Sequence, residues 1–327
     1  MKKIILILII SCIFVTGCGK VNKTDVVRNL KKKFDSSSGY KLSGYLTVNN
    51  NDEVYNYDVD VSYKKKDYYK VVLKNISNDH TQVILKNNSG VYVLTPSLNK
   101  SFKFQSDWPY DNSQIYLLNT IIRDLEKDDN KEFKVKEDKY IFKTKVNYPN
   151  NSKLINQKVY ISKDLKFEKV LVYDNTGIEI MSMKFDKIKY SPKFSKDEFK
   201  INSVLTDEKV EETGSFEDVI YPLFVPNGTK LVNEEMLNSN NGKRVIMNYD
   251  AEKSFLLVEE TTSVFNDFTI IPTLGEPLLL QDTLGIATDN SLSWTSGGVD
   301  FYLVSEVMNK EELIEIAQSI SGIVSTK

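Results

Sequence analysis

Side chains with nucleophilic or metal-binding chemistry are scarce in this 327-residue chain, which holds two cysteines and one histidine. Cys12 and Cys18 both lie near the N-terminus, and His80 stands in a polar turn, residues 78–81, between two strand-like runs. A Ser-His-Asp triad needs a histidine that two partners position, and zinc sites usually take several Cys or His ligands. We therefore predict no catalytic residue, no metal site and no cofactor, and we interpret His80 as a turn residue.

Charged residues give no sign of an active site or of a nucleic-acid surface. Glycosidases hold two carboxylates a fixed distance apart, but the 45 Asp and Glu residues are spread along the chain and single out no such pair. The 43 Lys and Arg residues balance them to a net charge of −2, so the basic field that nucleic-acid binding requires is missing. The chain is predicted not to be an enzyme. A glycan-directed hydrolase stays as an alternative that requires two carboxylates in a groove.

A charged start, a short apolar run and a cysteine characterise the first 18 residues. Lys2 and Lys3 precede the apolar residues 4–15, and Val15-Thr16-Gly17-Cys18 ends the stretch. The run of about 12 residues is shorter than the ~20 that a membrane-spanning helix needs, so it predicts a removable signal peptide over residues 1–17. The last four residues resemble a bacterial lipobox, in which the cysteine is acylated and becomes the new N-terminus.

Acylation of Cys18 predicts where the chain resides. We expect a palmitoylated lipoprotein on the extracytoplasmic face of the cell membrane, with residues 18–24 as its lipidated tether. The tether spans at most ~20 Å when extended, so the folded body sits close to the membrane. An uncleaved membrane anchor, the alternative, keeps the protein at a membrane as well. In the lipidated form no thiol is predicted for a disulfide, because Cys12 leaves with the signal peptide and Cys18 carries the lipid.

About 310 residues remain after cleavage, enough for two domains. The first is expected over residues 25–201 and starts with a helix capped by Thr24 or Asp25. From residue 40 the apolar period changes to two, and short strands separated by Asn, Asp and Gly turns predict an antiparallel meander. Three aromatic residues on one predicted strand share a face, which favours a core role over a binding role: Tyr55, Tyr57 and Tyr63.

A single amphipathic helix interrupts these strands. It follows Trp108 and Pro109, takes its cap from residues 111–113, and carries an apolar stripe from Ile115 to Leu125, so it has to lie on the sheet. Further strands are expected between residues 131 and 188. Trp108, like Trp294 later in the chain, stands beside turn residues and is interpreted as a loop anchor.

The second half of the chain is predicted to be a smaller unit. Residues 202–218 are acidic and weakly periodic and are expected to form a linker, after which residues 219–327 form a small α+β domain. It closes with a helix capped by Asn309, with Glu312 three residues on and Gly322 as its stop. The strands expected in it are 243–248, 254–262, 267–271 and 299–305.

Several stretches of the first domain carry a resemblance to a known family. They are Gly90-Val91-Tyr92-Val93-Leu94-Thr95-Pro96, Asn99-Lys100-Ser101-Phe102-Lys103-Phe104, Asp107-Trp108-Pro109, and Gln114 with Tyr116, Leu117 and Leu118. Through them residues 21 to about 200 resemble the lipoprotein-carrier-like superfamily, and within it the sporulation and germination lipoproteins of the GerS type. The resemblance implies an α+β fold, a curved antiparallel β-sheet or half-barrel with helices on its concave face.

The second domain resembles small domains of unknown function that are attached to such lipoproteins. Residues 293–298, 302–305 and 311–313 carry this likeness. It implies no activity of its own, so the fold leaves the function open.

Members of the superfamily use the concave face or the outer surface in different ways. Carriers shelter lipoprotein acyl chains, related sensors bind lipids or proteins, and GerS-type proteins are understood to bind and activate a cell-wall amidase. A chain tethered by its own lipid cannot shuttle as a soluble carrier does. The leading hypothesis is therefore a membrane-anchored, non-enzymatic lipoprotein that binds a cell-envelope protein in sporulation or spore germination, with a cell-wall amidase as one candidate.

The competing hypothesis is a hydrophobic ligand, a lipid or a lipoprotein acyl chain, held between the sheet and its helices. It predicts an unfilled cavity lined by residues such as Val61, Met181 and Phe185. A partner-binding scaffold instead predicts that these side chains pack onto the helix at 112–126 without a void. The sequence marks no interface residues and no free strand edge.

Overall fold

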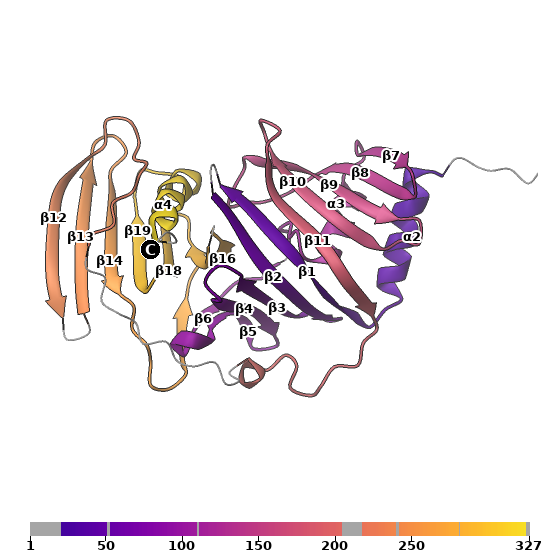
Figure 1. Ribbon diagram of the computed structural model, residues 1–327, viewed down its shortest axis with the longest axis horizontal. Helices are drawn as coiled ribbons and strands as arrows, with labels where there is room; N and C mark the ends of the chain where they lie inside the picture. The colour runs from indigo at the N-terminus through magenta and orange to yellow at the C-terminus, as the bar shows by residue number, and fades with distance from the viewer. Residues whose placement is uncertain are drawn as a thin grey trace, which may run out of the picture.

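The computed structural model describes residues 21–50, 53–109, 111–204, 218–239, 242–280 and 282–324. Three α-helices and two β-sheets account for most of this part of the chain (Figure 1). The predicted signal peptide, Cys18 and nearly all of the predicted acidic linker lie outside the described residues. The domain boundaries drawn from the sequence stay predictions.

Twelve strands form the first sheet, which is curved and open (Figure 1). They are β1 (Gly39–Asn50), β2 (Glu53–Lys64), β3 (Tyr68–Asn75), β4 (Thr81–Asn87), β5 (Gly90–Thr95), β6 (Lys100–Phe104), β7 (Glu132–Lys136), β8 (Lys139–Lys145), β9 (Leu154–Ser162), β10 (Phe167–Asp174), β11 (Glu179–Tyr190) and β15 (Thr269–Thr273). The order across the sheet is β15-β6-β5-β4-β3-β2-β1-β11-β10-β9-β8-β7. Neighbours are antiparallel except β15, which runs parallel to β6.

Two helices, α2 (Lys23–Asp35) and α3 (Leu118–Lys127), pack against this sheet. Leu30 and Ile121 belong to the same hydrophobic core as the inward residues of β1, β2, β3 and β11. The predicted α+β half-barrel with helices on one face is thereby confirmed. The cap of α2 is Asn22 rather than Thr24 or Asp25, because the Thr24 amide donates to Asn22 Oδ1 at 3.1 Å.

The start of α3 also differs from the prediction, because the helix begins at Leu118 and not near residue 112. The expected cap, Ser113, instead donates to the Asp124 carboxylate and accepts the amide of Asn147. Residues 113–117 are thus held as turns that connect the helix to the loop after β8. A polar residue before an apolar stripe predicted a cap, but Ser113 bonds Asp124 in the second half of α3 and Asn147 after β8 instead of the first amides of the helix.

The second sheet has seven antiparallel strands, in the order β12-β13-β14-β19-β18-β17-β16. They are β12 (Lys230–Ser239), β13 (Gly242–Asp250), β14 (Phe255–Thr261), β16 (Glu276–Leu279), β17 (Leu284–Ala287), β18 (Ser291–Ser296) and β19 (Val299–Val304). Helix α4 (Lys310–Val324) packs on it through Leu313, Ile316 and Ile320. Four of these strands, β12, β16, β17 and β18, were not predicted.

The predicted capping box of α4 is confirmed. Asn309 Oδ1 accepts the Glu312 amide at 3.0 Å, and the Glu312 carboxylate accepts the Asn309 amide at 3.0 Å. Gly322 was wrongly expected to end the helix, which runs on to Val324. A single glycine costs a helix only about 1 kcal/mol, so it does not by itself end one.

Asn309→Ala is expected to lower the free energy of unfolding by about 1 kcal/mol, because it removes the side-chain acceptor for one of the free amides at the start of α4. Urea denaturation at pH 7 measures this loss. The exposed neighbour Glu306→Ala is the matched control and should change stability by less than about 0.5 kcal/mol. Equal losses in the two variants would contradict a capping role for Asn309.

Candidate functional site: the interior of the first sheet

Aromatic side chains fill the interior between the sheet and its helices. The Tyr63 ring centroid lies 5.6 Å from that of Phe34, 5.1 Å from Tyr40 and 4.9 Å from Tyr69. Trp108 meets the Tyr69 ring edge-on at 5.9 Å. Such aromatic contacts stabilise a core beyond the area they bury. Tyr63 is therefore a core residue, as predicted, and Trp108 belongs to the same core.

The other aromatic residues singled out in the sequence are buried too. Tyr55 and Tyr57 belong to the core of the first sheet. Trp294 on β18 stacks on Phe301 of β19 with ring centroids 5.0 Å apart and belongs to the core of the second sheet. All three are buried, which confirms the core role predicted for Tyr55 and Tyr57, while Trp294, interpreted as a loop anchor, lies within strand β18.

Hydroxyl groups of this aromatic cluster fix the start of α3. Tyr40 Oη accepts the Leu118 amide at 3.2 Å and donates to Asn119 Oδ1 at 3.4 Å, while Asn119 Nδ2 donates to Tyr69 Oη at 3.0 Å. Burial raises the pKa of Tyr40 and of Tyr69 above the ordinary value, so both phenols stay protonated at physiological pH. The first turn of α3 therefore finds side-chain partners on β1 and β3 instead of a cap of its own.

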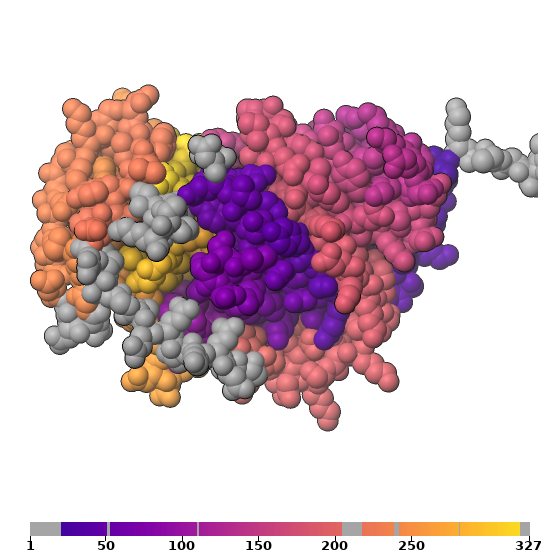
Figure 2. Space-filling model, in the orientation of Figure 1, coloured from indigo at the N-terminus to yellow at the C-terminus, as the bar shows by residue number. Residues whose placement is uncertain are grey.

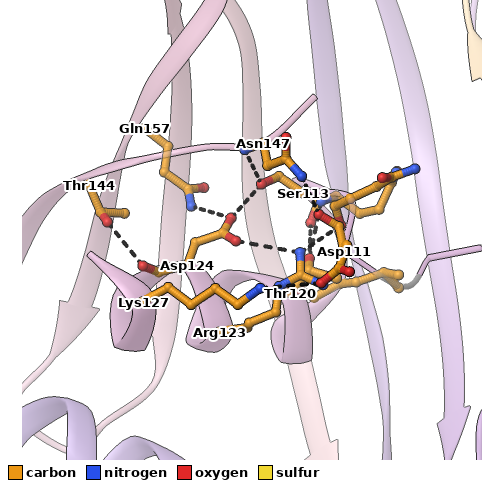
Figure 3. A network of polar contacts seen from close by, with 12 residues as sticks. Asp111, Ser113, Thr120, Arg123, Asp124, Lys127, Thr144, Asn147 and Gln157 are labelled. Atoms are coloured by element: carbon orange, nitrogen blue, oxygen red, sulfur yellow. Dashed lines mark hydrogen bonds and ion pairs between the residues drawn. The ribbon is translucent and has the colours of Figure 1, made fainter. Parts of the chain in front are cut away.

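A buried carboxylate fixes the other end of the helix (Figure 3). Asp124 Oδ2 accepts Ser113 Oγ at 2.6 Å and Gln157 Nε2 at 3.1 Å, and the Arg123 guanidinium lies 3.5 Å from Oδ1. Thr144 Oγ1 donates to the Asp124 carbonyl at 3.2 Å. Burial raises the pKa of Asp124, although its hydrogen bonds and Arg123 oppose the shift. The network connects α3 with β8 and β9.

The residues expected to line a ligand cavity are packed into the core. Val61, Met181 and Phe185 are all buried, and the Phe185 ring lies 6.1 Å from that of Phe167. Met181 also borders a cavity of about 100 Å³ between the sheet and residues 277–284. A pocket for a drug-sized ligand measures roughly 300–1,000 Å³. The packing agrees with a partner-binding scaffold and leaves little room for an acyl chain at these residues.

Strands β16 and β17 close the mouth of the half-barrel. Leu279, Leu284 and Ile286 pack against the core of the first sheet. Gln82 on β4 holds them in place, because its Oε1 accepts the Leu284 amide at 2.5 Å and its Nε2 donates to the Leu284 carbonyl at 3.3 Å. Asn75 Nδ2 donates to the Asp282 carbonyl at 3.3 Å. The C-terminal half thus covers this end of the core of the first sheet.

An open hollow of about 590 Å³ lies around the loop between β8 and β9 and is bordered by two carboxylates, Asp128 and Glu132. Burial alone would raise the pKa of Asp128, but hydrogen bonds from the Lys145 amide, Thr144 and the Asn130 amide together lower it below its usual value. A general acid needs the opposite shift. Glu132 lies 3.8 Å from the ammonium of Lys143. The hollow therefore offers no acid and base pair suited to glycan hydrolysis.

His80 lies in the turn between β3 and β4 and borders a cavity of about 190 Å³ together with Asp282 and Gly298. Among the described residues no group of three or more His, Cys, Asp or Glu side chains could hold a metal ion. None of the helices in the described part of the chain combines the length and the apolar character that a membrane span requires.

Comparison with known proteins identifies the family. No family model matches the chain. The sporulation protein YdcC of Bacillus subtilis (strain 168) is 37% identical over 329 residues, which covers 98% of this chain and 97% of YdcC. The chain belongs to the YdcC family of sporulation proteins. This match confirms the resemblance to sporulation proteins that the sequence predicted. The alignment covers both halves of the chain.

Solved structures show more distant likenesses. The MucA/MucB complex of Pseudomonas aeruginosa includes a chain that is 10% identical with a TM-score of 0.34, and the match covers 93% of this chain and 97% of that one. A chain from the structure of the CwlD amidase of Clostridioides difficile in complex with the GerS lipoprotein is 17% identical with a TM-score of 0.24. The match covers 54% of this chain and 99% of that one. A LolA superfamily protein of Nitrosomonas europaea is 9% identical with a TM-score of 0.33. The match covers 56% of this chain and 99% of that one.

Proposed function

We propose that this YdcC-family protein is a lipid-anchored, non-enzymatic lipoprotein that binds a cell-envelope protein during sporulation. The relative named as a sporulation protein matches it along nearly its whole length. The lipobox-like residues 15–18 support export and acylation at Cys18. A cell-wall amidase is the candidate partner that the GerS-type resemblance of residues 90–118 implies.

The packed interior of the first sheet is the observation that favours a protein partner over a lipid ligand. Leu284 and Ile286 pack into the core of the first sheet, and the cavity that Leu284 borders measures about 100 Å³. An acyl chain that entered at this end of the sheet would have to displace these side chains and the hydrogen bonds of Gln82. Binding at the outer surface needs no such rearrangement, since most interfaces form with little backbone movement.

Copurification from sporulating host cells tests this proposal. The full chain, tagged at its C-terminus, is extracted from membranes in mild detergent, and bound proteins and lipids are identified by mass spectrometry. We expect one envelope protein in stoichiometric amount. Acyl lipid bound to the folded body without any protein partner would contradict the proposal and favour a carrier or sensor.

Cys18→Ala is expected to move the protein from the membrane fraction to the soluble fraction, because a single acylated residue supplies the anchor. Cell fractionation and immunoblotting measure the distribution. Cys12→Ala, inside the predicted signal peptide, is the matched control and should stay on the membrane. If the Cys18 variant remained on the membrane after its signal peptide had been removed, the lipid anchor would be wrong.

A further inference from the structure

The two sheets differ in how their edge strands are protected. The edges are β15 and β7 in the first sheet and β12 and β16 in the second. β15 and β16 are five and four residues long and contain Pro272 and Pro277, while the five-residue β7 exposes Lys134 and Lys136. Short length, proline and lysine all discourage the pairing of a further strand. β12 has ten residues, no proline, and a lysine only at its first position.

β12 also exposes apolar side chains along its length. Val232 is 61% exposed and Met236 50%, and Leu231 and Leu237 are exposed as well. Successive side chains in a strand point to opposite faces, so Met236 and Leu237 present apolar surface on both sides of the sheet. A long edge with exposed apolar residues on both faces is a ready template for another strand.

The surface beside β12 extends this apolar area. Tyr221 Oη donates to Glu234 Oε2 at 2.8 Å, which places the segment that precedes β12 next to the strand. In that segment Leu223 is 79% exposed, and Phe224 is exposed too. Clustered exposed apolar residues mark interaction sites more often than single ones do.

The register of β12 limits where a partner strand can pair. A β-bulge interrupts the pairing with β13 between Leu231 and Asn233, and from Asn233 to Ser239 the register is regular. Glu234 and Glu235 lie in this regular stretch and point to opposite faces. Among the described strands this edge has no further neighbour, and it carries a pair of acidic side chains.

These two acids decide between possible occupants. If a second copy of the chain paired antiparallel about Glu234 or about Glu235, that glutamate would face its own counterpart in the other copy, because directly opposite residues share a face of the sheet. Like charges directly opposite each other destabilise a strand pair, whereas opposite charges stabilise it by roughly 0.2–1 kcal/mol each. The edge is thus better suited to a foreign strand with basic residues at its centre and apolar residues on either side.

We propose that β12 docks an extended, basic segment of the partner protein, which pairs with it as an added β-strand. The inference rests on the proposed function and names the surface and the chemistry of its partner. β12 lies at one end of the molecule and α2, which follows the predicted tether, at the other (Figure 1, Figure 2). The lipid on Cys18 would therefore leave this edge directed away from the membrane and accessible.

Synthetic peptides test the site on the full chain in mild detergent. The probe is a short peptide with a central Lys-Arg pair flanked by valine and threonine, and its binding is followed by fluorescence anisotropy. We expect the double variant Glu234→Lys/Glu235→Lys to bind it at least about tenfold more weakly, because attractive pairs become repulsive. N-methylation of alternate peptide amides should abolish binding, since an added strand is held by backbone hydrogen bonds.

The control variant is Glu132→Lys on β7, an exposed edge glutamate of the other sheet, which should bind the basic peptide like the wild type. Circular dichroism checks that each variant is folded. Equal affinity for a peptide with a central Glu-Asp pair, or unchanged binding by the double variant, would overturn the inference. The inference would also be overturned by a wild-type dimer, detected by sedimentation, that the double variant does not form. Such a dimer would mean that a second copy of the chain occupies the edge.

Copurification separates this inference from the proposed function. If an envelope protein copurifies with the wild type and with Glu132→Lys but is lost from Glu234→Lys/Glu235→Lys, both hold. If it copurifies equally with all three, the function stands and the site is wrong. If none copurifies while the basic peptide still binds as described, β12 stands as a strand-docking edge and the proposed function fails.

Discussion

Asp124→Ala is expected to lower the free energy of unfolding by about 3 kcal/mol, because it leaves buried donors without their acceptor. Ser113 and Gln157 both donate to Asp124 Oδ2, and both are about 1% exposed, so water cannot replace the carboxylate. The loss also frees α3 from β9. We therefore expect the interior to become accessible to hydrophobic dyes at denaturant concentrations where the wild type excludes them.

Urea denaturation of the chain without residues 1–18 measures this effect. Lys127→Ala is the matched control on the same helix, because its ion pair with Asp111, at 3.2 Å, is exposed on both sides and should contribute less than about 1 kcal/mol. Asp124→Asn keeps an acceptor oxygen for Ser113 or Gln157 and should lose less than the alanine variant. A loss for Asp124→Ala no larger than for Lys127→Ala would show that the network does not hold the helix.

β2 has one buried face and could be predicted from the sequence, whereas β12 has none and was missed. β2 alternates because Tyr55, Tyr57, Val59 and Val61 face the core while Asp58 and Asp60 between them are exposed. β12 has no buried side, so burial imposes no period on its sequence. The strand that forms the proposed docking edge was therefore missed for the same reason that makes it available to a partner.

Long-range polar contacts were equally hidden. Gln82 pairs with Leu284, which lies 202 positions later in the chain, and no local pattern announces such a partner. Residues 267–271 were expected as a strand, but nothing in their sequence shows that β15 would join the first sheet beside β6. The periodicity of a segment reflects which of its faces is buried, but it does not identify the segment against which that face packs.

Glu259 predicts an unusual pH dependence of stability. It is 0% exposed on β14, and its Oε2 accepts the Ile220 amide at 3.1 Å. Burial raises its pKa to about 7, the nearby Glu234 adds to the shift, and the Ile220 amide and Lys243 oppose it. Because the folded protein holds this proton more tightly than the unfolded chain, stability from this group is complete below about pH 4.5 and is lost as pH rises through about 7.

Glu259→Gln removes this titration and should leave the neutral side chain in place at every pH. We expect the stability of the variant relative to the wild type to rise by about 3 kcal/mol between pH 4 and pH 8, as the wild type pays for a buried charge. Urea denaturation at several pH values measures this difference. Glu260→Gln is the matched control, because Glu260 pairs with Arg244 at the surface, at 2.7 Å, and its relative stability should stay nearly constant. A Glu259→Gln difference that stays equally constant would mean that Glu259 is ionised in the folded protein without cost. The expected rise would instead mean that ionisation of the buried Glu259 destabilises the folded protein, even though the Ile220 amide favours the carboxylate.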